Sequence, residues 1–404
     1  MNTDPKCFWL TNYLETLLVQ VWYPMSVATN SRAQKKVILD YYEKTGCDDF
    51  SDLGFKLLDF GFRGVSSPES AAIGGLAHLV NFCGSDTMAA MLCARKYYLE
   101  EGGAFNSVIP GVPLPVPSLS VPAAEHSTIT SWGKDGEKDA FANMLDSCAA
   151  PPRNSGAQFG RAMFGRALRP RTSADARALH TSRRYPDGIV SVVSDSYDIY
   201  NACSKLWGEE LKGKVDERLA KTGPPQGRLV VRPDSGEPKD VVVKCLELLG
   251  EKFGTSTTSS GHKLLPKHVR VLQGDGISYE TVGEILAHMA EKGWAVDNVL
   301  FGSGGALLQK LNRDTQKCAF KCSELRKADG SVTLVYKDPI TDKGKQSKKG
   351  RMTVEKGADG KLTTVTEGKG DPAKDVMHEV FRDGVCLNTT TLDEVKALAA
   401  IDGK

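Results

Sequence analysis

The feature that most constrains the fold of this chain is a recurring unit: a short apolar run, then glycine or polar residues, then a helical stretch. Seven such units follow one another, and the runs expected to be strands are 55–60, 79–82, 118–124, 189–194, 228–232, 269–273 and 299–301. Near-continuous apolar strands need cover on both faces, so the pattern predicts parallel strands joined by crossover helices. Seven or eight units favour an α/β fold with a β/α-barrel-like core, and an open doubly wound sheet is the alternative.

The pattern changes near residue 319, where alternating strands are expected over 331–337, 351–355 and 362–366, followed by a short helix over 392–400. We therefore expect N-terminal helices within 1–50, a barrel domain over 51–318 and a small α+β domain over 319–404 that packs with those helices. Two stretches fit no unit. The proline-rich segment 101–118 is expected to be a long loop, and the arginine-rich segment 151–187 a disordered insertion, with an RNA- or phosphate-binding loop as the alternative.

Charge and composition exclude several classes of protein. The chain has 52 Lys and Arg against 50 Asp and Glu, a balance that argues against a polybasic nucleic-acid binder. No run of about 18 apolar residues predicts a membrane span, and the first residues lack the pattern of a signal peptide. The ten cysteines are scattered, so reduced thiols in a cytoplasmic protein are expected and no zinc site is.

Polar residues follow the expected strands, and the loops after parallel strands share one face of such a fold. Arginines and a glycine-rich turn before a helix suit phosphate groups, while carboxylates suit Mg²⁺ or sugar hydroxyls. A phosphorylated sugar is therefore the expected ligand. His126, next to Glu125 at a strand end, is either a structural histidine or a nucleophile or acid–base group.

Ten ordered segments carry a resemblance to a known family. They include LDFGFRGVSS (58–67), AHLVNFCGSDT (77–87), SVPAAEHSTITSWGKDGEKDAF (120–141), SVVSDSYDIYNAC (191–203), VVRPDSG (230–236), RVLQGDG (270–276) and FGSGGALLQKLNRD (301–314). The chain resembles the nicotinamide phosphoribosyltransferases, which are type II phosphoribosyltransferases. The resemblance covers nearly everything except 101–118 and 151–187.

The resemblance implies a role for individual residues. Phe60 would stack on the pyridine ring, Asp86 would accept a hydrogen bond from the carboxamide, and Ser191 and Asp195 would border the nicotinamide tunnel and the histidine. His126, beside Glu125, would be phosphorylated by ATP. The remaining implied contacts to diphosphate, ribose or 5′-phosphate come from Arg63, Arg232, Asp234, Gly274, Asp275, Gly304, Gly305 and Arg313. The catalytic set would be His126, Asp234 and Glu125, and the diphosphate-binding set Arg63, His126 and Arg232.

The implied reaction transfers phosphoribosyl from 5-phosphoribosyl 1-diphosphate to nicotinamide in NAD salvage, with Mg²⁺ and with ATP as a coupled co-substrate. A cytoplasmic homodimer with its active site at the interface is also implied. Transfer to nicotinate is one alternative, and a catalytically impaired homologue that acts by association is another. The family carries a further N-terminal segment with a DSYK-type motif, so we expect this chain to be truncated at its N-terminus; SDSYD at 194–198 is a different element.

Overall fold

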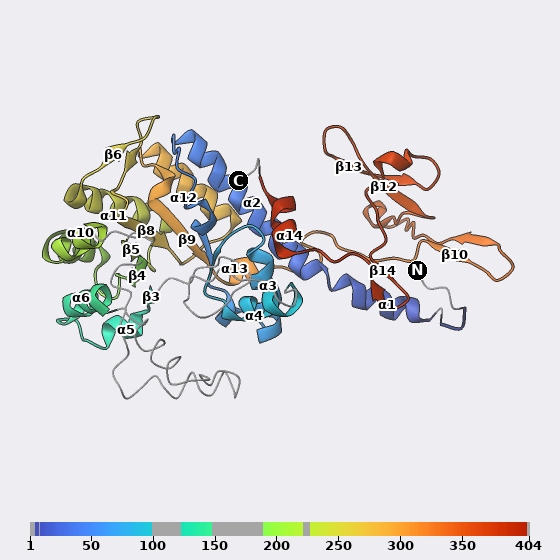
Figure 1. Cartoon of the computed structure of the whole chain (residues 1–404), viewed down its shortest axis with the longest axis horizontal. Helices are drawn as coiled ribbons and strands as arrows, with labels where there is room; N and C mark the ends of the chain where they lie inside the picture. The colour runs from blue at the N-terminus through green and yellow to red at the C-terminus, as the bar shows by residue number, and fades with distance from the viewer. Residues whose placement is uncertain (1–4, 8, 99–122, 148–188, 221–226, 402–404) are drawn as a thin grey trace. The chain divides into compact units, whose positions relative to one another are not determined.

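The computed structural model describes residues 5–7, 9–98, 123–147, 189–220 and 227–401 (Figure 1). Segments 101–118 and 151–187 lie outside the described residues. The chain divides into two compact units, one of residues 1–26 with 312–391 and one of residues 27–311 with 392–404. The domain limits expected near residues 50 and 318 stay predictions.

A seven-stranded parallel sheet forms the centre of the larger unit (Figure 1). Its strands are β1 (Leu57–Asp59), β2 (Gly84–Ser85), β3 (Ala123–Ala124), β4 (Ile189–Val193), β5 (Arg228–Arg232), β8 (Val269–Gln273) and β9 (Val299–Ser303). They lie in the order β2-β1-β9-β8-β5-β4-β3, so the first and last strands of the series pair with each other. This is the cyclic strand order of a β/α barrel. Among the described residues, β2 and β3 are the two edge strands and do not pair with each other. The expected barrel-like parallel core is confirmed.

The strand expected over 79–82 is wrong. Leu79 ends helix α3 (Pro68–His78), Leu79 and Phe82 are fully buried, and the strand β2 comes two residues later. Residues 79–82 are apolar because the end of a helix is buried there. Periodicity cannot distinguish such a short apolar run from a buried strand.

Helices follow the strands around the sheet. They are α3, α4 (Met88–Tyr97), α5 (His126–Thr130), α6 (Glu137–Ser147), α9 (Ile199–Asn201) continued by the π-helix η5 (Ala202–Glu210), α10 (Lys212–Ala220), α11 (Pro238–Phe253), α12 (Tyr279–Glu291) and α13 (Gly305–Leu308). Ser67 caps α3 by accepting a hydrogen bond from the Ser70 amide, and Ser278 and Thr281 form a capping box on α12. These caps fix where each helix leaves its strand-end loop.

Two layers of apolar side chains hold the sheet. The outer layer joins strand residues such as Val231 and Val271 to helix residues such as Val242 and Leu286. A small inner cluster consists of Leu58, Val230, Leu272 and Leu300, with Phe60 packed against it. Residues on the same face as this cluster therefore point into the barrel interior.

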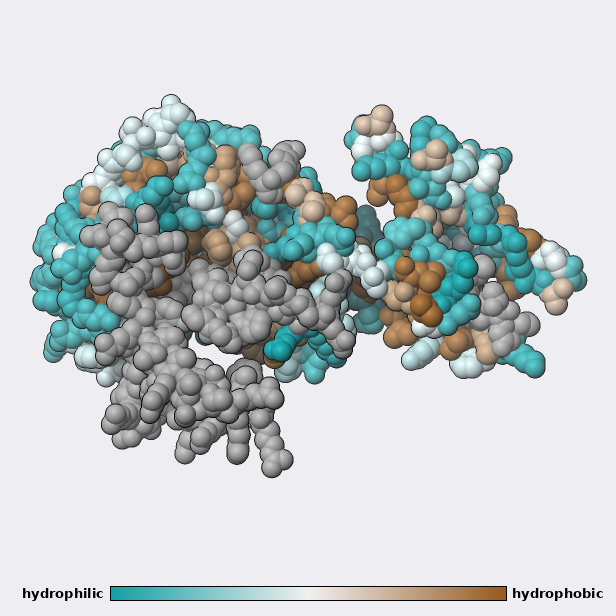
Figure 2. Space-filling view, viewed as in Figure 1, coloured by the Kyte–Doolittle hydropathy of each residue, from teal (hydrophilic) through white to brown (hydrophobic). Residues whose placement is uncertain are grey.

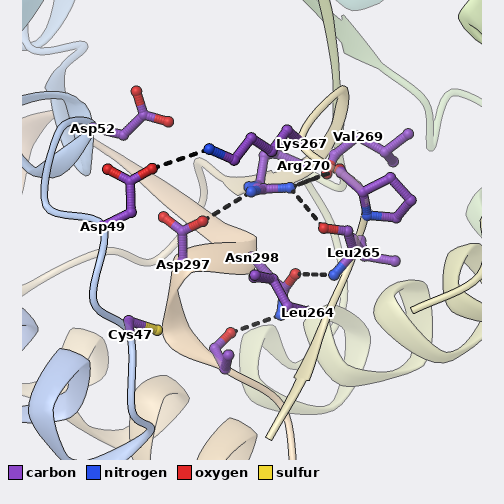
Figure 3. Close-up of polar contacts among 12 residues, drawn as sticks. Cys47, Asp49, Asp52, Leu264, Leu265, Lys267, Val269, Arg270, Asp297 and Asn298 are labelled. Carbon is purple, nitrogen blue, oxygen red and sulfur yellow. Dashed lines mark hydrogen bonds and ion pairs between the residues drawn. The ribbon is translucent and has the colours of Figure 1, made fainter. Parts of the chain in front are cut away.

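An ionic cluster around Asp297 lies at the amino-terminal end of the barrel strands, and Figure 3 shows the Asp297–Arg270 pair within it. Asp297 lies 2.8 Å from the Lys56 Nζ and 2.8 Å from the Arg270 Nη2, and Tyr42 donates a 2.8 Å hydrogen bond to it. Burial alone would raise the pKa of Asp297, but the charges of Lys56 and Arg270 hold this pKa below its usual range. Asn298 adds a hydrogen bond from the Leu265 amide. The charges at this end of the strands are therefore paired with one another.

The helix α2 (Trp22–Lys44) contributes Ile38, Leu39 and Tyr42 to the main core of the larger unit. The final helix α14 (Leu392–Ala399) also belongs to that unit, because Leu392 packs in a cluster with Leu76 and Leu79. Apolar side chains of both helices thus pack in the barrel unit.

The smaller unit holds α1 (Leu10–Val19) and three hairpins, β10–β11 (Glu324–Arg326, Val332–Leu334), β12–β13 (Met352–Lys356, Leu362–Thr366) and β14–β15 (Phe381–Arg382, Val385–Cys386). A fourth hairpin, β6–β7 (Ser256–Thr257, Lys263–Leu264), belongs to the barrel unit. Figure 2 shows hydrophobic side chains on the surface of the smaller unit. Trp9, Tyr13 and Leu17, on or next to α1, are each more than half exposed. None of the described helices is both long and apolar enough to cross a lipid bilayer.

Candidate functional site

Phe60 follows β1 and presents its ring at the carboxyl end of the sheet. Its amide donates a 2.9 Å hydrogen bond to the Ser303 carbonyl at the end of β9. The ring covers Gly302 so closely that a Cβ there would lie 2.0 Å from the Phe60 Cε2. The Arg232 guanidinium carbon lies 5.8 Å from the centre of the same ring. The absence of a side chain at Gly302 therefore allows the Phe60 ring to lie beside the Arg232 guanidinium.

Two carboxylates near β1 differ in what they do. Asp59 is fully buried, and accepts hydrogen bonds from the Gly61 amide at 2.7 Å and the Ser85 hydroxyl at 3.2 Å. Burial raises the pKa of Asp59 to about 6. Its contacts fix the turn that carries Phe60. The amide of Asp86 donates to the Asp59 carbonyl at 2.9 Å, so the half-buried Asp86 follows β2 at the same edge of the sheet.

Arg232, the last residue of β5, lies between two carboxylates. It donates to both oxygens of Glu125, at 3.0 and 3.4 Å, and to both oxygens of Asp234, at 3.4 and 3.3 Å. The arginine side chain is 4 % exposed, whereas that of Glu125 is 48 % exposed. A Cβ at Gly274 would lie 3.3 Å from both the Arg232 Nε and the Asp234 Oδ1. The glycine thus leaves room for this buried cation and its partners.

His126 begins α5 and lies among groups from two other strand ends. Its Nδ1 is 3.0 Å from the Ser196 hydroxyl. Its Nε2 is 3.7 Å from the Asp195 Oδ1 and 3.5 Å from the Asp234 Oδ2. Asp195 in turn accepts hydrogen bonds from the Asp234 amide at 3.0 Å and the Ser235 hydroxyl at 2.6 Å. The imidazole is 43 % exposed, so a ligand can reach it.

The other residues expected in the site occupy different surroundings. Arg63 is exposed in the 3-10 turn η3 (Phe62–Gly64) and makes no hydrogen bond or ion pair with any described residue. A Cβ on Gly64 would lie 3.7 Å from the Gly305 amide, so this turn meets the loop of Gly304 and Gly305. Ser191 is buried on β4 in register with Val230 of the inner cluster.

Asp275 is exposed after β8, and the Gln273 side chain donates to its carbonyl at 3.0 Å. Arg313 belongs to the smaller unit, where its side chain lies 2.8 Å from the Asp314 carboxylate and donates to the Cys318 carbonyl at 3.2 Å. Its expected role toward a 5′-phosphate stays a prediction.

Sequence reasoning missed three contacts: Ser196 on His126, Ser235 on Asp195, and Gly302 beneath Phe60. Both serines follow a strand-end aspartate directly, so the rule that selected Asp195 and Asp234 could have extended to them. The contact of Gly302 with Phe60 depends on the register between β1 and β9, which could not be predicted from the sequence alone.

The arrangement places an aromatic ring, a buried arginine, a histidine and several carboxylates at the end of one parallel sheet. The exposed Arg63 and the glycine-rich loop before α13 lie at the same end. Such a set suits an anionic sugar phosphate carrying a flat ring system.

Comparison with known proteins identifies the family. Residues 55–385 match the model of the nicotinate phosphoribosyltransferase (NAPRTase) family. The chain belongs to this family. It is 46% identical over 404 residues to a nicotinamide phosphoribosyltransferase of Xanthomonas campestris pv. campestris, covering 98% of this chain and 74% of the relative. It is 29% identical to the protein of that name from Acinetobacter baylyi, covering 98% and 71% of the two chains.

Among solved structures, a nicotinate-nucleotide pyrophosphorylase from Pyrococcus furiosus matches 92% of this chain and 68% of its own, with a TM-score of 0.44 and 12% identity. Membership of the NAPRTase family makes this protein an enzyme, a pentosyltransferase of NAD biosynthesis that transfers a phosphoribosyl group.

Proposed function

We propose that the protein transfers the phosphoribosyl group of 5-phosphoribosyl 1-diphosphate to nicotinamide, giving nicotinamide mononucleotide and diphosphate. C1 of the sugar loses diphosphate as the pyridine nitrogen attacks, through an oxocarbenium-like transition state. The enzyme's main contribution is to hold the ring against the sugar and to stabilise the charge on the departing diphosphate. Phe60 would hold the ring, while Arg232 and Arg63 would bind the diphosphate.

The observation that carries nicotinamide as the acceptor is the placement of Asp86 next to the strand end of Phe60. The Asp86 amide donates a hydrogen bond to the carbonyl of Asp59, the residue directly before Phe60. Asp86 therefore lies beside the strand end that carries the Phe60 ring. A carboxylate accepts a hydrogen bond from a carboxamide and repels the carboxylate of nicotinate. The names of the two relatives above agree with this choice, and nicotinate, which the family's description names, is the second candidate.

The proposed ATP coupling rests on the surroundings of His126. One ring nitrogen of His126 lies near the Asp195 and Asp234 carboxylates and the other near the Ser196 hydroxyl. These contacts orient the imidazole, as a histidine that accepts a phosphoryl group has to be oriented. Phosphorylation of His126 would add negative charge beside Arg232, which would change the affinity for diphosphate.

Mg²⁺ would enter with the diphosphate. Among the described residues, no cluster of three or more His, Cys, Asp and Glu could hold a metal ion by itself. Asp195 has a buried Oδ1 that accepts no hydrogen bond, and Asp234 lies beside it. This donor set fits an ion that keeps most of its waters and shares the phosphate oxygens. When bound, Mg²⁺ would neutralise part of the diphosphate charge.

We also propose a cytoplasmic homodimer. Trp9, Tyr13, Leu17 and Val21 are each at least 53 % exposed on one short segment. Contiguous exposed apolar side chains of this size usually cover a partner surface.

The deciding experiment measures product formation from phosphoribosyl diphosphate with nicotinamide or nicotinate, each with and without ATP and Mg²⁺. Nicotinamide mononucleotide as the main product, with a higher yield when ATP is present, is the expected result. A preference for nicotinate would replace the proposal by its second candidate.

A further inference from the structure

Two neighbouring loops carry the groups assigned to the acceptor. Phe60 directly follows β1, and Asp86 directly follows β2. These strands are parallel neighbours, and Asp59, the last residue of β1, is in register with Ser85, the last residue of β2. The side chain of Asp59 is fully buried and makes hydrogen bonds to both loops. A single carboxylate therefore links the two groups.

One oxygen of this carboxylate holds the turn of Phe60. The Asp59 Oδ1 accepts a 2.7 Å hydrogen bond from the amide of Gly61, two residues further along the chain. This contact is an Asx turn that encloses Phe60, so it restricts the backbone from which the ring projects. The Phe60 amide separately donates to the Ser303 carbonyl on β9 at 2.9 Å. The carboxylate and β9 together hold the residue that carries the ring.

The other oxygen holds the loop of Asp86. The Ser85 hydroxyl donates to the Asp59 Oδ2 at 3.2 Å, and the same hydroxyl oxygen accepts a 3.0 Å hydrogen bond from the Thr87 amide. Between them, the Asp86 amide donates to the Asp59 carbonyl at 2.9 Å. The residues on both sides of Asp86 are thus connected to one carboxylate, either directly or through one hydroxyl.

The carboxylate of Asp59 has little room to shift. A Cβ on Gly75, in helix α3, would lie 3.0 Å from the Oδ2 atom. A Cβ on Gly61 would lie 3.1 Å from the Oδ1 atom. Both oxygens are therefore held at fixed places by atoms packed closely around them, and the two loops that bond to them are held in turn.

Asp59 changes its charge within a pH range that an activity assay can cover. Burial raises the pKa of its carboxyl to about 6, and the nearby charge of Asp86 adds to the increase. Asp86 is the charged group that faces it among the described residues, whereas α3 presents Gly75 and β9 presents Ser303. Protonation turns one carboxylate oxygen from an acceptor into a donor. Acidification below about pH 6 should therefore loosen one of the two loops.

We propose that Asp59 is a positioning residue that holds Phe60 and Asp86 at a fixed spacing, and thereby sets the affinity for the pyridine acceptor and the preference for its carboxamide. The inference rests on the proposed function, which assigns the acceptor to these two residues. Asp59 is fully buried and out of reach of a substrate, so it acts through its own turn and through Ser85.

The test compares Asp59→Asn with the unaltered full chain by steady-state kinetics at several pH values. The asparagine amide has one oxygen that accepts, so the Gly61 amide or the Ser85 hydroxyl loses its acceptor. The KM for nicotinamide is expected to rise about tenfold above neutral pH, the effect of one lost hydrogen bond to a charged group. In the unaltered protein kcat/KM for nicotinamide should fall below about pH 6, and this inflection should be absent from Asp59→Asn.

Asp49→Asn is the matched control. Asp49 also accepts hydrogen bonds from an amide two residues further on and from a serine hydroxyl, both of Ser51, at 3.1 and 2.6 Å. It pairs with Lys267 near the other end of the barrel (Figure 3). Its KM for nicotinamide and its pH profile should equal those of the unaltered protein. Titration of phosphoribosyl diphosphate is common to all variants and cancels in the comparison.

Ser85→Ala removes one of the two contacts and leaves the ionisable carboxyl. The hydrogen bond from Ser85 favours the charged form of Asp59, so its loss should move the inflection to a higher pH. The loop of Asp86 is the one released, so the ratio of kcat/KM for nicotinamide over nicotinate should fall about 3- to 10-fold. This variant tests the inference even where Asp59→Asn does not fold.

An unchanged KM for nicotinamide in Asp59→Asn, or an inflection that persists in it, would overturn the inference. A lower kcat with the same KM and the same pH profile would also overturn it, because the carboxylate would then be merely structural. Failure of the proposed function looks different, since the unaltered protein would then prefer nicotinate. In that case the KM for nicotinate in Asp59→Asn tests the positioning role by itself.

Discussion

Arg232 and Glu125, 107 positions apart in the chain, form a two-point ion pair in which both guanidinium Nη atoms donate to the carboxylate. The pair joins the ends of β5 and β3 across the intervening β4. Since the arginine is buried and the glutamate half exposed, Glu125 is the partner that can move away. A diphosphate that binds Arg232 would take the place of this carboxylate.

Replacement of Arg232 by lysine should weaken binding of phosphoribosyl diphosphate about 10- to 100-fold, because an ammonium cannot make the two-point contact of a guanidinium. Titration calorimetry measures the change. Arg228→Lys is the matched control, since Arg228 begins the same strand and pairs with Asp52 at 2.6 Å at its opposite end. Equal affinities in the two variants would contradict the assignment.

His126→Ala should abolish ATP hydrolysis and its stimulation of product formation, while a slower transfer that does not depend on ATP remains. The residual transfer is expected because the groups that hold the ring and the diphosphate are still present. Coupled assays of ADP release and nicotinamide mononucleotide formation test this. Unchanged ADP release would rule out His126 as the acceptor.

Asp86→Asn should raise the activity with nicotinate relative to nicotinamide by about tenfold, because the amide no longer repels a carboxylate; a polar contact of this kind is worth about 1–3 kcal/mol. The measured quantity is the ratio of kcat/KM for the two substrates. Asp49→Asn, which alters a carboxylate paired with Lys267 near the other end of the barrel, is the control. A constant ratio would show that another group discriminates between the acceptors.

Gly302→Ala should displace the Phe60 ring, because the new Cβ would lie 2.0 Å from its Cε2. The KM for nicotinamide is expected to rise about tenfold, as an overpacked core contact costs about 1–3 kcal/mol, with a smaller change in the KM for phosphoribosyl diphosphate. Gly213→Ala adds the same methyl group on α10 where no atom lies within 4 Å, and should leave both constants unchanged. Equal increases in both KM values would argue against a role confined to the ring.

His78→Gln should reduce the loss of stability in acid. His78 is fully buried, with Nδ1 3.0 Å from the Ser31 hydroxyl and Nε2 3.1 Å from the Leu57 carbonyl, and burial lowers its pKa from 6.5 to about 4. Between these two values the unfolded chain binds a proton that the folded chain does not. The free energy of unfolding therefore falls as the pH decreases from 6.5 toward 4, by about 3 kcal/mol from this residue.

Urea unfolding at several pH values in that window tests the point. The glutamine variant is expected to be less stable at pH 8 but to lose less on acidification than the unaltered protein. The same slope in both proteins would mean that His78 does not carry the effect.

Much of the barrel could be predicted from the sequence because its strands are continuous apolar runs bounded by polar residues. The strands 228–232 and 269–273 have the bounds that the pattern indicated. The run 79–82 misled because the end of a buried helix has the same composition. The strand order could not be predicted residue by residue, since it depends on contacts between segments far apart in the chain.

The candidate site, too, could be predicted from the sequence only in part. The rule that strand-end residues converge indicated that Glu125, Asp195, Arg232 and Asp234 would meet, and the structure brings them together. The same rule could not tell that Asp59 would stay buried and hold a turn. Nor could it find the Ser196 contact, because a hydroxyl partner depends on the conformation of two loops.

The pairing of β1 with β9 has a consequence for synthesis of the chain. Phe60 is translated early, but its amide finds its partner only when Ser303 has emerged, and the ring rests on Gly302 from the same late strand. A nascent chain that ends before β9 exposes the inner apolar cluster and has no formed acceptor pocket. The chain between β1 and β9 must lose conformational entropy before the stabilising contacts between these strands can form. Folding is therefore expected to be slow and to need the whole barrel. Capacity to bind the pyridine ring would thus be acquired in the last step of folding, and a ring-binding probe would report on completion of the fold.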